Sequence, residues 1–258
     1  MADWMRRWLD FDLRNMEEWG CPGDLNWLAL VPSGPHMAGS RPREQVRTRG
    51  GIFFTIDMDP RWVKRCLAEG RPEEAGRYVD HLLNQAEWLL RTQDIGILTI
   101  SPPMLVRLAQ REELAKLIND KVHLIVWQGA HMDADTRHLL RTEVFPEVKL
   151  RGFYGSTMVL GGAFERVGLT DDEPCVFDSF YPYISFAVVD PETGAEVPYG
   201  ERGRVVMNHV SKSQLLPNNL ERDTAIRVAP SGPRRGDSVA DVEPVAMFDN
   251  EPVIEGVY

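Results

Sequence analysis

The chain has 258 residues, 43% of them hydrophobic, and a formal net charge of −10 at pH 7. This length and content suffice for a sizeable core, in one domain or two tightly joined lobes. The negative charge argues against nonspecific binding to nucleic acid or anionic membranes. No apolar run approaches the ~18–20 residues that span a bilayer. We therefore expect neither nucleic acid nor a membrane as a partner.

The cysteines and the first residues indicate a cellular compartment. Cys21, Cys66 and Cys175 are widely spaced and form no C-x-x-C motif. Three cysteines cannot all pair within one chain, which fits a reducing compartment. The opening residues alternate between apolar and charged, without the apolar stretch of a signal peptide. We therefore expect a cytoplasmic protein.

The first predicted element is an amphipathic helix that ends at the Gly- and Pro-rich residues 20–23. Charged residues separate large apolar residues at near-helical spacing, namely Trp4, Trp8, Phe11, Met16 and Trp19. This pattern favours a helix that packs on the core over a membrane or partner helix.

Strand-like and helix-like segments then alternate along the chain. Apolar runs predict strands at residues 26–31, 51–57, 94–101, 122–127 and 148–153, and a Pro- and Gly-rich loop at 32–39. Helical patterns predict helices at residues 60–67, 73–92, 104–109 and 133–140. This alternation predicts an α/β fold with a mainly parallel sheet and crossover helices, over residues 1–163.

After about residue 163, short β-like runs replace the helical pattern. Residues 183–189 and 204–210 are predicted hairpin partners, and further strands are predicted at 224–228 and 239–247. We therefore expect a smaller β-rich lobe over residues 164–258, with a mobile loop at 229–237.

The tetrapeptide Tyr154-Gly155-Ser156-Thr157 is the first candidate for a ligand site. It lies between a predicted strand and a predicted small-residue loop at 158–163. A glycine and two short hydroxyl side chains after a strand leave backbone N–H groups open to an anion. The neighbouring tyrosine can stack on a flat ring such as a purine. Taken alone, the tetrapeptide is better explained as an ordinary tight turn beside a half-buried tyrosine at the end of a strand.

A second candidate turn is Gln128-Gly129-Ala130, which also follows a predicted strand. Ligands of open α/β sheets bind beyond the carboxyl ends of strands, so we expect the two turns side by side. Small residues at 129 and 130 let a purine approach the backbone. A tight strand-to-helix turn without a ligand explains them as well.

Two later segments complete a family pattern. Residues 190–194 read Asp-Pro-Glu-Thr-Gly, residues 200–206 read Gly-Glu-Arg-Gly-Arg-Val-Val, and Leu216-Pro217 lead to Asp223. With the two turns, in this order, these segments resemble the adenylate-forming superfamily, in particular its phenylacetate–CoA ligase-like branch, which includes proteins of phenazine and aryl-acid pathways. The resemblance extends from Trp27 to residues 252–258, which resemble the start of that family's hinge to its lid.

The resemblance implies roles for single residues. Tyr154 stacks on adenine, Ser156 and Thr157 face the phosphates, Asp223 accepts hydrogen bonds from the ribose diol, and His36 lines the acyl pocket. Each has a plainer explanation. Asp223 also fits a solvated Glu-Arg-Asp surface run, and His36 also fits a loop histidine without a role.

The chain also departs from the family pattern. It has no Ser/Thr/Gly-rich phosphate loop ending in lysine, and it stops at Tyr258, where the lid with its lysine begins. Met158 stands where the family usually has a glutamate that binds Mg²⁺, and a thioether is a poor ligand for that hard cation. His131 and His138 lack the i, i+4 spacing of a zinc pair. We therefore predict no metal site and regard Mg²⁺ as doubtful.

These observations leave two functional hypotheses. The first is a partial or degenerate aryl- or acyl-adenylate-forming ligase, of a class that activates a carboxylate with ATP, often before transfer to coenzyme A. The second is a non-catalytic module that binds a nucleotide or aryl acid, or a truncated partner subunit. Without the missing parts, apolar surface must be covered, so we expect a homo-oligomer or an opening helix folded over the gap.

Overall fold

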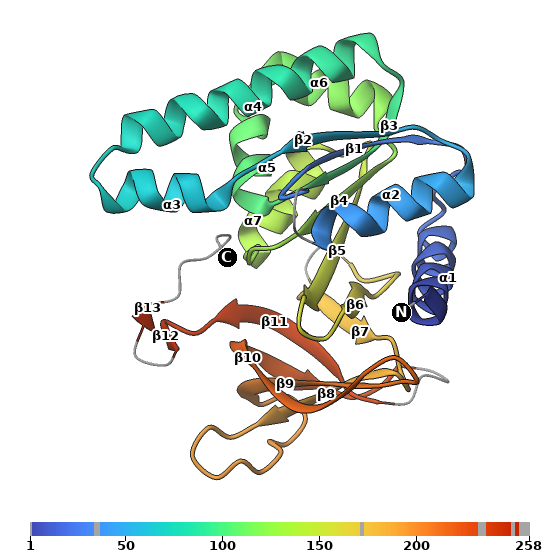
Figure 1. Cartoon of the computed structure of the whole chain (residues 1–258), viewed down its shortest axis with the longest axis vertical. Coiled ribbons are helices and arrows are strands. Elements are labelled where there is room, and N and C mark those ends of the chain that lie inside the picture. Colours follow the sequence, from blue (N-terminus) through green and yellow to red (C-terminus); the bar gives the residue numbers. More distant parts are fainter. Residues whose placement is uncertain (1, 34–36, 171–172, 232–235, 249–250, 253–258) are drawn as a thin grey trace. The chain divides into compact units, whose positions relative to one another are not determined.

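A computed structural model describes residues 2–33, 37–170, 173–231, 236–248 and 251–252 (Figure 1). The chain forms two compact units. Trp19–Arg151 build the first, which we call the parallel unit, and Met1–Glu18 with Gly152–Glu255 build the second, the antiparallel unit. The change in sequence pattern predicts a boundary between residues 163 and 164, whereas the two units divide between residues 151 and 152.

The parallel unit contains the sheet expected from strand–helix alternation. Its strands are β1 (Asn26–Val31), β2 (Phe53–Asp57), β3 (Ile95–Ile100) and β4 (Leu124–Gln128), in the order β2-β1-β3-β4, and the first residues of β5 (Lys149–Ser156) follow β4. The pairs β1–β2, β1–β3 and β3–β4 are parallel. Every residue of β3 and β4 is buried, as in parallel sheets that helices cover on both faces.

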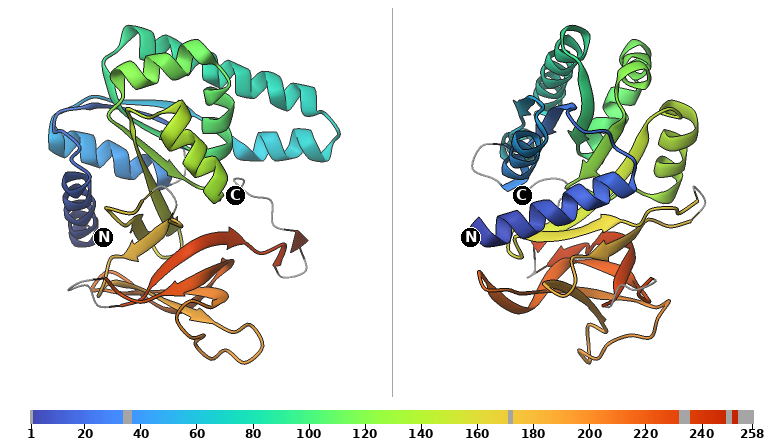
Figure 2. Two further views of the ribbon diagram at one scale, coloured as in Figure 1. Left: turned by 180° about the vertical axis from the view of Figure 1, so that it is seen from behind. Right: turned by 90° about the vertical axis from the view of Figure 1, so that its right-hand side faces the viewer.

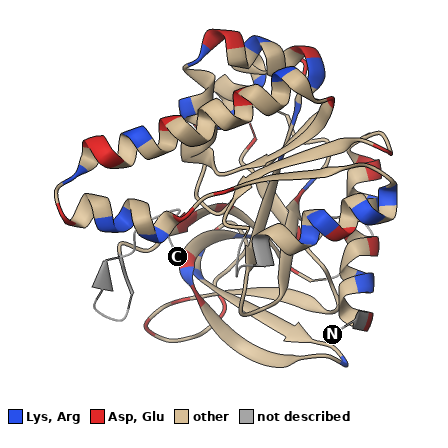
Figure 3. Ribbon diagram, turned by 45° about the horizontal axis from the view of Figure 1, so that its top comes forward, with Lys and Arg blue, Asp and Glu red and all other residues tan. Residues whose placement is uncertain are grey.

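Helices lie on both sides of this sheet (Figure 2). They are α2 (Met37–Arg49), α3 (Pro60–Ala68), α4 (Pro72–Thr92), α5 (Pro102–Ala109), α6 (Glu112–Lys121) and α7 (Ala134–Leu139), which continues as a π-helical turn (Leu140–Val144). Helices α3, α4 and α5 each begin on a proline, whose fixed φ suits the first turn. Charges of both signs follow one another along these helices, whereas the strands carry few (Figure 3).

Helix α2 corrects one prediction. It begins at Met37, inside the predicted loop at 32–39, and no helix was predicted over its length. Its sequence is mostly polar and contains Pro42, which lacks the backbone N–H that a helix interior uses. The apolar periodicity that would indicate a helix is therefore weak.

The antiparallel unit is a seven-stranded sheet that includes the rest of β5. Its other strands are β6 (Gly161–Glu165), β7 (Val176–Ser179), β8 (Ile184–Val189), β9 (Arg202–Val210), β10 (Leu215–Val228) and β11 (Ser238–Pro244). The order is β5-β6-β7-β11-β10-β9-β8, and each neighbouring pair is antiparallel. Strand β8 also contacts β7 and β11, so the sheet curls. A separate short pair joins β12 (Met247–Phe248) and β13 (Glu251–Pro252).

The predicted β8–β9 hairpin is confirmed, with Ile184 opposite His209 and Val189 opposite Arg204. Two other predictions are corrected. Strand β5 extends to Ser156, and residues 161–165 form β6 instead of continuing a loop. A short turn at residues 157–160 is all that separates β5 from β6.

Helix α1 (Ala2–Glu18) packs on the antiparallel unit through its apolar face. Trp4 and Trp8 are 1% and 2% exposed. The Trp8 ring centroid lies 5.4 Å from that of Phe164, and the Phe11 centroid lies 4.3 Å from that of Phe180. The prediction of a core-packing amphipathic helix is confirmed, and self-association remains a prediction.

Within the described residues, no helix combines the length and apolarity needed to cross a membrane. Cys21, Cys66 and Cys175 are buried and form no disulfide.

Candidate functional site

The antiparallel unit brings together two of the predicted ligand residues. Tyr154 lies near the end of β5 and Asp223 lies in β10, and three strands separate these two in the sheet order. The Tyr154 hydroxyl nevertheless donates a hydrogen bond to Asp223 Oδ2 at 2.8 Å, because the sheet curls. The Tyr154 ring centroid lies 5.8 Å from that of Phe177 and 6.0 Å from that of Phe186. These rings fix the tyrosine, and both members of the pair are half-buried.

A second pair joins the same two strands. The Ser156 side chain interacts with the Glu221 carboxylate and lowers its pKa. The Asn219 side-chain amide donates to Glu221 Oε1 at 2.6 Å. Alternate residues of a strand share a face. Tyr154 and Ser156 therefore lie on one face of β5, and Glu221 and Asp223 lie on one face of β10. The result is a polar cluster of Tyr154, Ser156, Glu221 and Asp223, which we call the β5–β10 cluster.

Glu221 is a site residue that the sequence pattern did not predict. The Glu-Arg-Asp run reads as a solvated surface, and the strand was predicted to begin only at residue 224. The signal that could have found it is the two-residue spacing of Glu221 and Asp223, which places both on one face of a strand.

The electrostatics of the cluster centre on Glu221. Burial raises the pKa of Glu221 from 4.5 to about 7, and the neighbouring charge of Asp223 adds to the rise. The hydrogen bonds from Ser156 and Asn219 oppose it, because they stabilise the charged form. Glu221 therefore changes its charge near neutral pH, beside the hydroxyl that is predicted to face a phosphate. An anion at Ser156 meets a neutral neighbour only below this pKa.

The tetrapeptide itself differs from the open loop that the sequence predicted. Tyr154, Gly155 and Ser156 are paired with β6, so their backbone belongs to the sheet ladder and does not form an open anion-binding loop. Gly155 is required by this pairing, because a Cβ there would lie 2.6 Å from the Gly161 carbonyl oxygen. Thr157 is the first residue outside the strand and is exposed.

Met158 follows in the turn and is 64% exposed. Its thioether is a soft ligand and does not fit the hard, oxygen-seeking Mg²⁺. The side chains at this turn therefore do not supply the carboxylate that such a cation takes.

The other predicted turn lies in the parallel unit. Gly129 has φ +83°, a left-handed conformation that favours glycine, and it follows β4 as predicted. Before it, the Gln128 side-chain oxygen accepts a hydrogen bond from Arg41 at 2.9 Å, and both side chains are buried. Because Gly129 and Ala130 belong to one unit and Tyr154 to the other, their proximity remains a prediction. His36 lies outside the described residues.

No protein-family model and no curated protein matches the sequence. Solved structures share its fold. A 2-hydroxyisobutyryl-CoA ligase in complex with R3-HIB-AMP aligns with a TM-score of 0.65 and 13% identity, over 98% of this chain and 51% of that chain. MatB from Rhodopseudomonas palustris, bound to ATP, aligns at 0.55 and 18%, over 91% and 43%. IdnL1 aligns at 0.57 and 14%, over 89% and 47%.

The chain thus spans about half the length of these proteins. At such low identity the likeness establishes the fold alone. That fold is an α/β fold shared with acyl-CoA and adenylate-forming ligases, as the order of motifs predicted.

Proposed function

We propose that this chain is the central body of a partial or degenerate adenylate-forming ligase of the phenylacetate–CoA ligase-like branch. The observation that carries the proposal is the hydrogen bond between Tyr154 and Asp223. The family pattern assigns the first residue to adenine and the second to ribose. Their contact supports our proposal that both residues serve one nucleoside site.

The residues of the β5–β10 cluster fit the assigned roles. Tyr154 offers a ring held by Phe177 and Phe186, on which a purine can stack. The Asp223 carboxylate accepts from Tyr154 through Oδ2. A carboxylate is the kind of acceptor that binds ribose hydroxyls. Ser156 offers a hydroxyl to a phosphate. ATP, when bound, supplies the adenylate group and the pyrophosphate leaving group for activation of a carboxylate.

The structural neighbours support this class of ligand. The 2-hydroxyisobutyryl-CoA ligase has been solved with 2-HIB-AMP and CoA, and MatB has been solved with ATP. We propose by analogy that the ligands here are an adenine nucleotide and a small carboxylate, with coenzyme A as the acceptor. Met158 in place of a carboxylate predicts that Mg²⁺-dependent activity of this chain is low.

A second candidate is a non-catalytic binding module, or a truncated subunit that completes a site with another chain. One observation favours it. The turn after Ser156 offers the Met158 thioether, and no carboxylate, to a cation. Phosphoryl-group chemistry depends on charge neutralisation, which this turn does not provide.

Calorimetric titration with AMP and ATP tests the proposal. We expect weak, saturable binding to the wild-type chain, lost in Tyr154→Ala and in Asp223→Ala. Glu192→Gln is the matched control, because Glu192 is an exposed carboxylate outside the cluster. Equal affinity in all four proteins would refute the assignment of the site. A sub-micromolar dissociation constant for ATP would refute the hypothesis that the chain is a partial or degenerate ligase. Pyrophosphate release with any aryl acid would refute it as well.

A further inference from the structure

The turn at residues 157–160 links the end of β5 to β6, directly after Ser156. Leu160 has φ +55°, a left-handed conformation that is unfavourable for a residue other than glycine. Within the turn, the Leu160 N–H donates to the Thr157 carbonyl at 3.3 Å, a long hydrogen bond. A turn with this backbone persists when the surrounding structure holds it.

Side chains from outside the turn bind three consecutive carbonyl oxygens. These side chains come from the β9–β10 connection, from β9 and from α1. The pairs are Gln214 Nε2 to Met158 O at 2.7 Å, His209 Nδ1 to Val159 O at 2.6 Å, and Trp4 Nε1 to Leu160 O at 2.9 Å. We call Trp4, His209 and Gln214 the turn clamp. Each of its members supplies one N–H donor to the turn.

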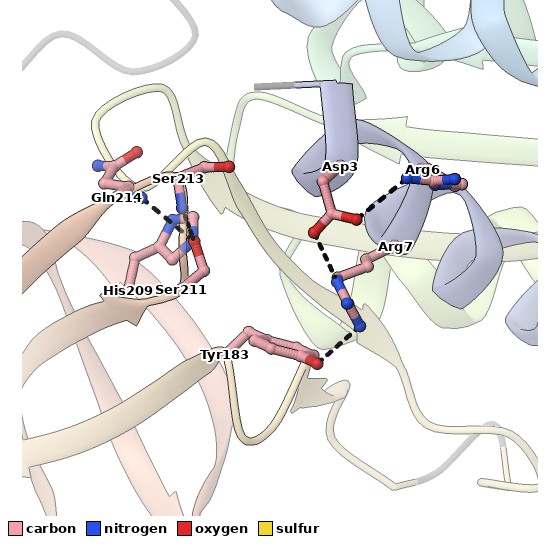
Figure 4. A network of polar contacts seen from close by, with 8 residues as sticks. All are labelled: Asp3, Arg6, Arg7, Tyr183, His209, Ser211, Ser213 and Gln214. Carbon is pink, nitrogen blue, oxygen red and sulfur yellow. Dashed lines mark hydrogen bonds and ion pairs between the residues drawn. The ribbon is translucent and has the colours of Figure 1, made fainter.

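The hydrogen bonds of His209 define its protonation state. The Val159 carbonyl can only accept, so Nδ1 carries the proton. Nε2 lies 2.9 Å from Ser211 Oγ, which already accepts from the backbone N–H groups of Ser213 and Gln214 at 3.1 and 3.2 Å (Figure 4). The Ser211 hydroxyl therefore donates to Nε2. The ring is buried and both nitrogens are satisfied in the neutral form, and burial lowers the pKa of His209.

Helix α1 delivers Trp4 to this position. The Trp4 ring centroid lies 4.0 Å from that of His209, so the two donors also pack on each other. Three residues further along, Arg7 donates to the Tyr183 hydroxyl at 3.0 Å and pairs with Asp3 (Figure 4). The first turns of α1 are therefore fixed to the antiparallel unit by an indole hydrogen bond, ring packing and this polar contact.

We propose that helix α1 and His209 are positioning elements of the ligand site, which hold the 157–160 turn and with it the hydroxyls of Ser156 and Thr157. The identity of the ligand rests on the proposed function, whereas the control of the turn does not. The sequence predicts α1 only as an amphipathic helix that packs on the core. In this proposal α1 also positions the ligand site.

The test compares Trp4→Phe, which keeps an aromatic ring but removes the donor, with Trp88→Phe. Trp88 is an exposed tryptophan on α4 in the parallel unit and serves as the control. Amide hydrogen exchange over residues 155–162 reports the turn without any ligand, and AMP titration reports binding. We expect about 5-fold faster exchange and about 5-fold weaker AMP binding in Trp4→Phe alone, the effect of one ordinary hydrogen bond.

The two readouts separate this inference from the proposed function. Unchanged exchange in Trp4→Phe would overturn the inference, as would faster exchange with unchanged AMP affinity. Faster exchange in a chain whose wild type binds no AMP would support control of the turn and remove the proposed nucleotide.

If Trp4→Phe fails to fold, His209 provides the second comparison. The amide of His209→Asn can donate near the position of Nδ1, whereas His209→Leu donates nothing. We expect slow exchange of the turn in the first and fast exchange in the second. Equal exchange in both would overturn the inference.

Discussion

Replacing Glu221 by glutamine tests the electrostatics of the β5–β10 cluster. Glutamine keeps the shape of the side chain, and its amide can accept from Asn219 and donate to Ser156. The substitution removes the ionisable carboxyl group, and with it the negative charge that Glu221 carries above its pKa. In the folded chain burial and Asp223 hold the pKa of Glu221 near 7, against 4.5 for the ordinary side chain.

The sign of the effect follows from proton binding in the two states. Well below pH 4.5 the folded and unfolded chains both carry the proton, and the stabilising contribution is complete. Between these two pKa values the unfolded chain loses its proton first, so the free energy of unfolding falls as the pH rises. Above the folded pKa the loss is complete and constant.

The pKa difference between 4.5 and about 7 corresponds to about 3 kcal/mol. The Glu221 side chain retains partial solvent exposure. We therefore expect the free energy of unfolding of Glu221→Gln to exceed that of the wild type by ~1–2 kcal/mol at about pH 8. Near pH 4 and below, the two proteins should show the same pH dependence.

Urea unfolding followed by tryptophan fluorescence measures this at several pH values, with the slope m as a check that both proteins unfold alike. Glu192→Gln is the control for removal of one exposed negative charge. In an Asp223→Asn background, the stability difference that Glu221→Gln produces should be smaller. Burial still raises the pKa of Glu221 there, but the additional charge of Asp223 is gone. Parallel stability curves for wild type and Glu221→Gln over the whole range would refute the reasoning.

Three further predictions follow from the same contacts. In AMP titrations at about pH 8, Glu221→Gln should bind more tightly than wild type, by about 10-fold for removal of one nearby negative charge, and should lose the pH dependence; equal curves would contradict a phosphate beside Ser156. Deleting residues 2–18 uncovers Phe164 and Phe180, so light scattering should show self-association, and a monodisperse, equally stable product would contradict the covering role of α1. Gly155→Ala should cost ~1–3 kcal/mol in urea unfolding, because its Cβ would press on the Gly161 carbonyl, and an unchanged midpoint would contradict the β5–β6 register.

The sheet of the parallel unit was predictable because its strands are continuous apolar runs. Residues 95–100 are all buried. A short apolar run that is soon followed by Pro102-Pro103 favours a buried strand over a helix. Strand β10 was predicted only from residue 224, although it begins at Leu215. Its first half contains Asn218 with φ +56° and shifts of register against β9, so polar residues interrupt the alternation that indicates a strand.

Part of the candidate site was predictable from the order of sequence motifs, and part depends on tertiary contacts. Tyr154 and Asp223 belong to segments of a family pattern, and the structure joins them. Glu221 acquires its raised pKa mainly from burial, which only the tertiary structure provides, and the charge of Asp223 adds to the rise. The turn clamp unites Trp4 with Leu160, 156 positions apart, and no local pattern encodes such a contact.

Discrimination between adenosine and 2′,3′-dideoxyadenosine tests most directly that Asp223 holds a ribose. Both ligands lack phosphates, so Glu221 has little influence on the comparison. We predict that the wild-type chain binds adenosine about 10-fold more tightly, as a hydrogen bond to a carboxylate implies, and that Asp223→Asn reduces this preference. Equal affinity of the wild-type chain for both ligands, or an undiminished preference in Asp223→Asn, would contradict a nucleoside site built on Tyr154 and Asp223.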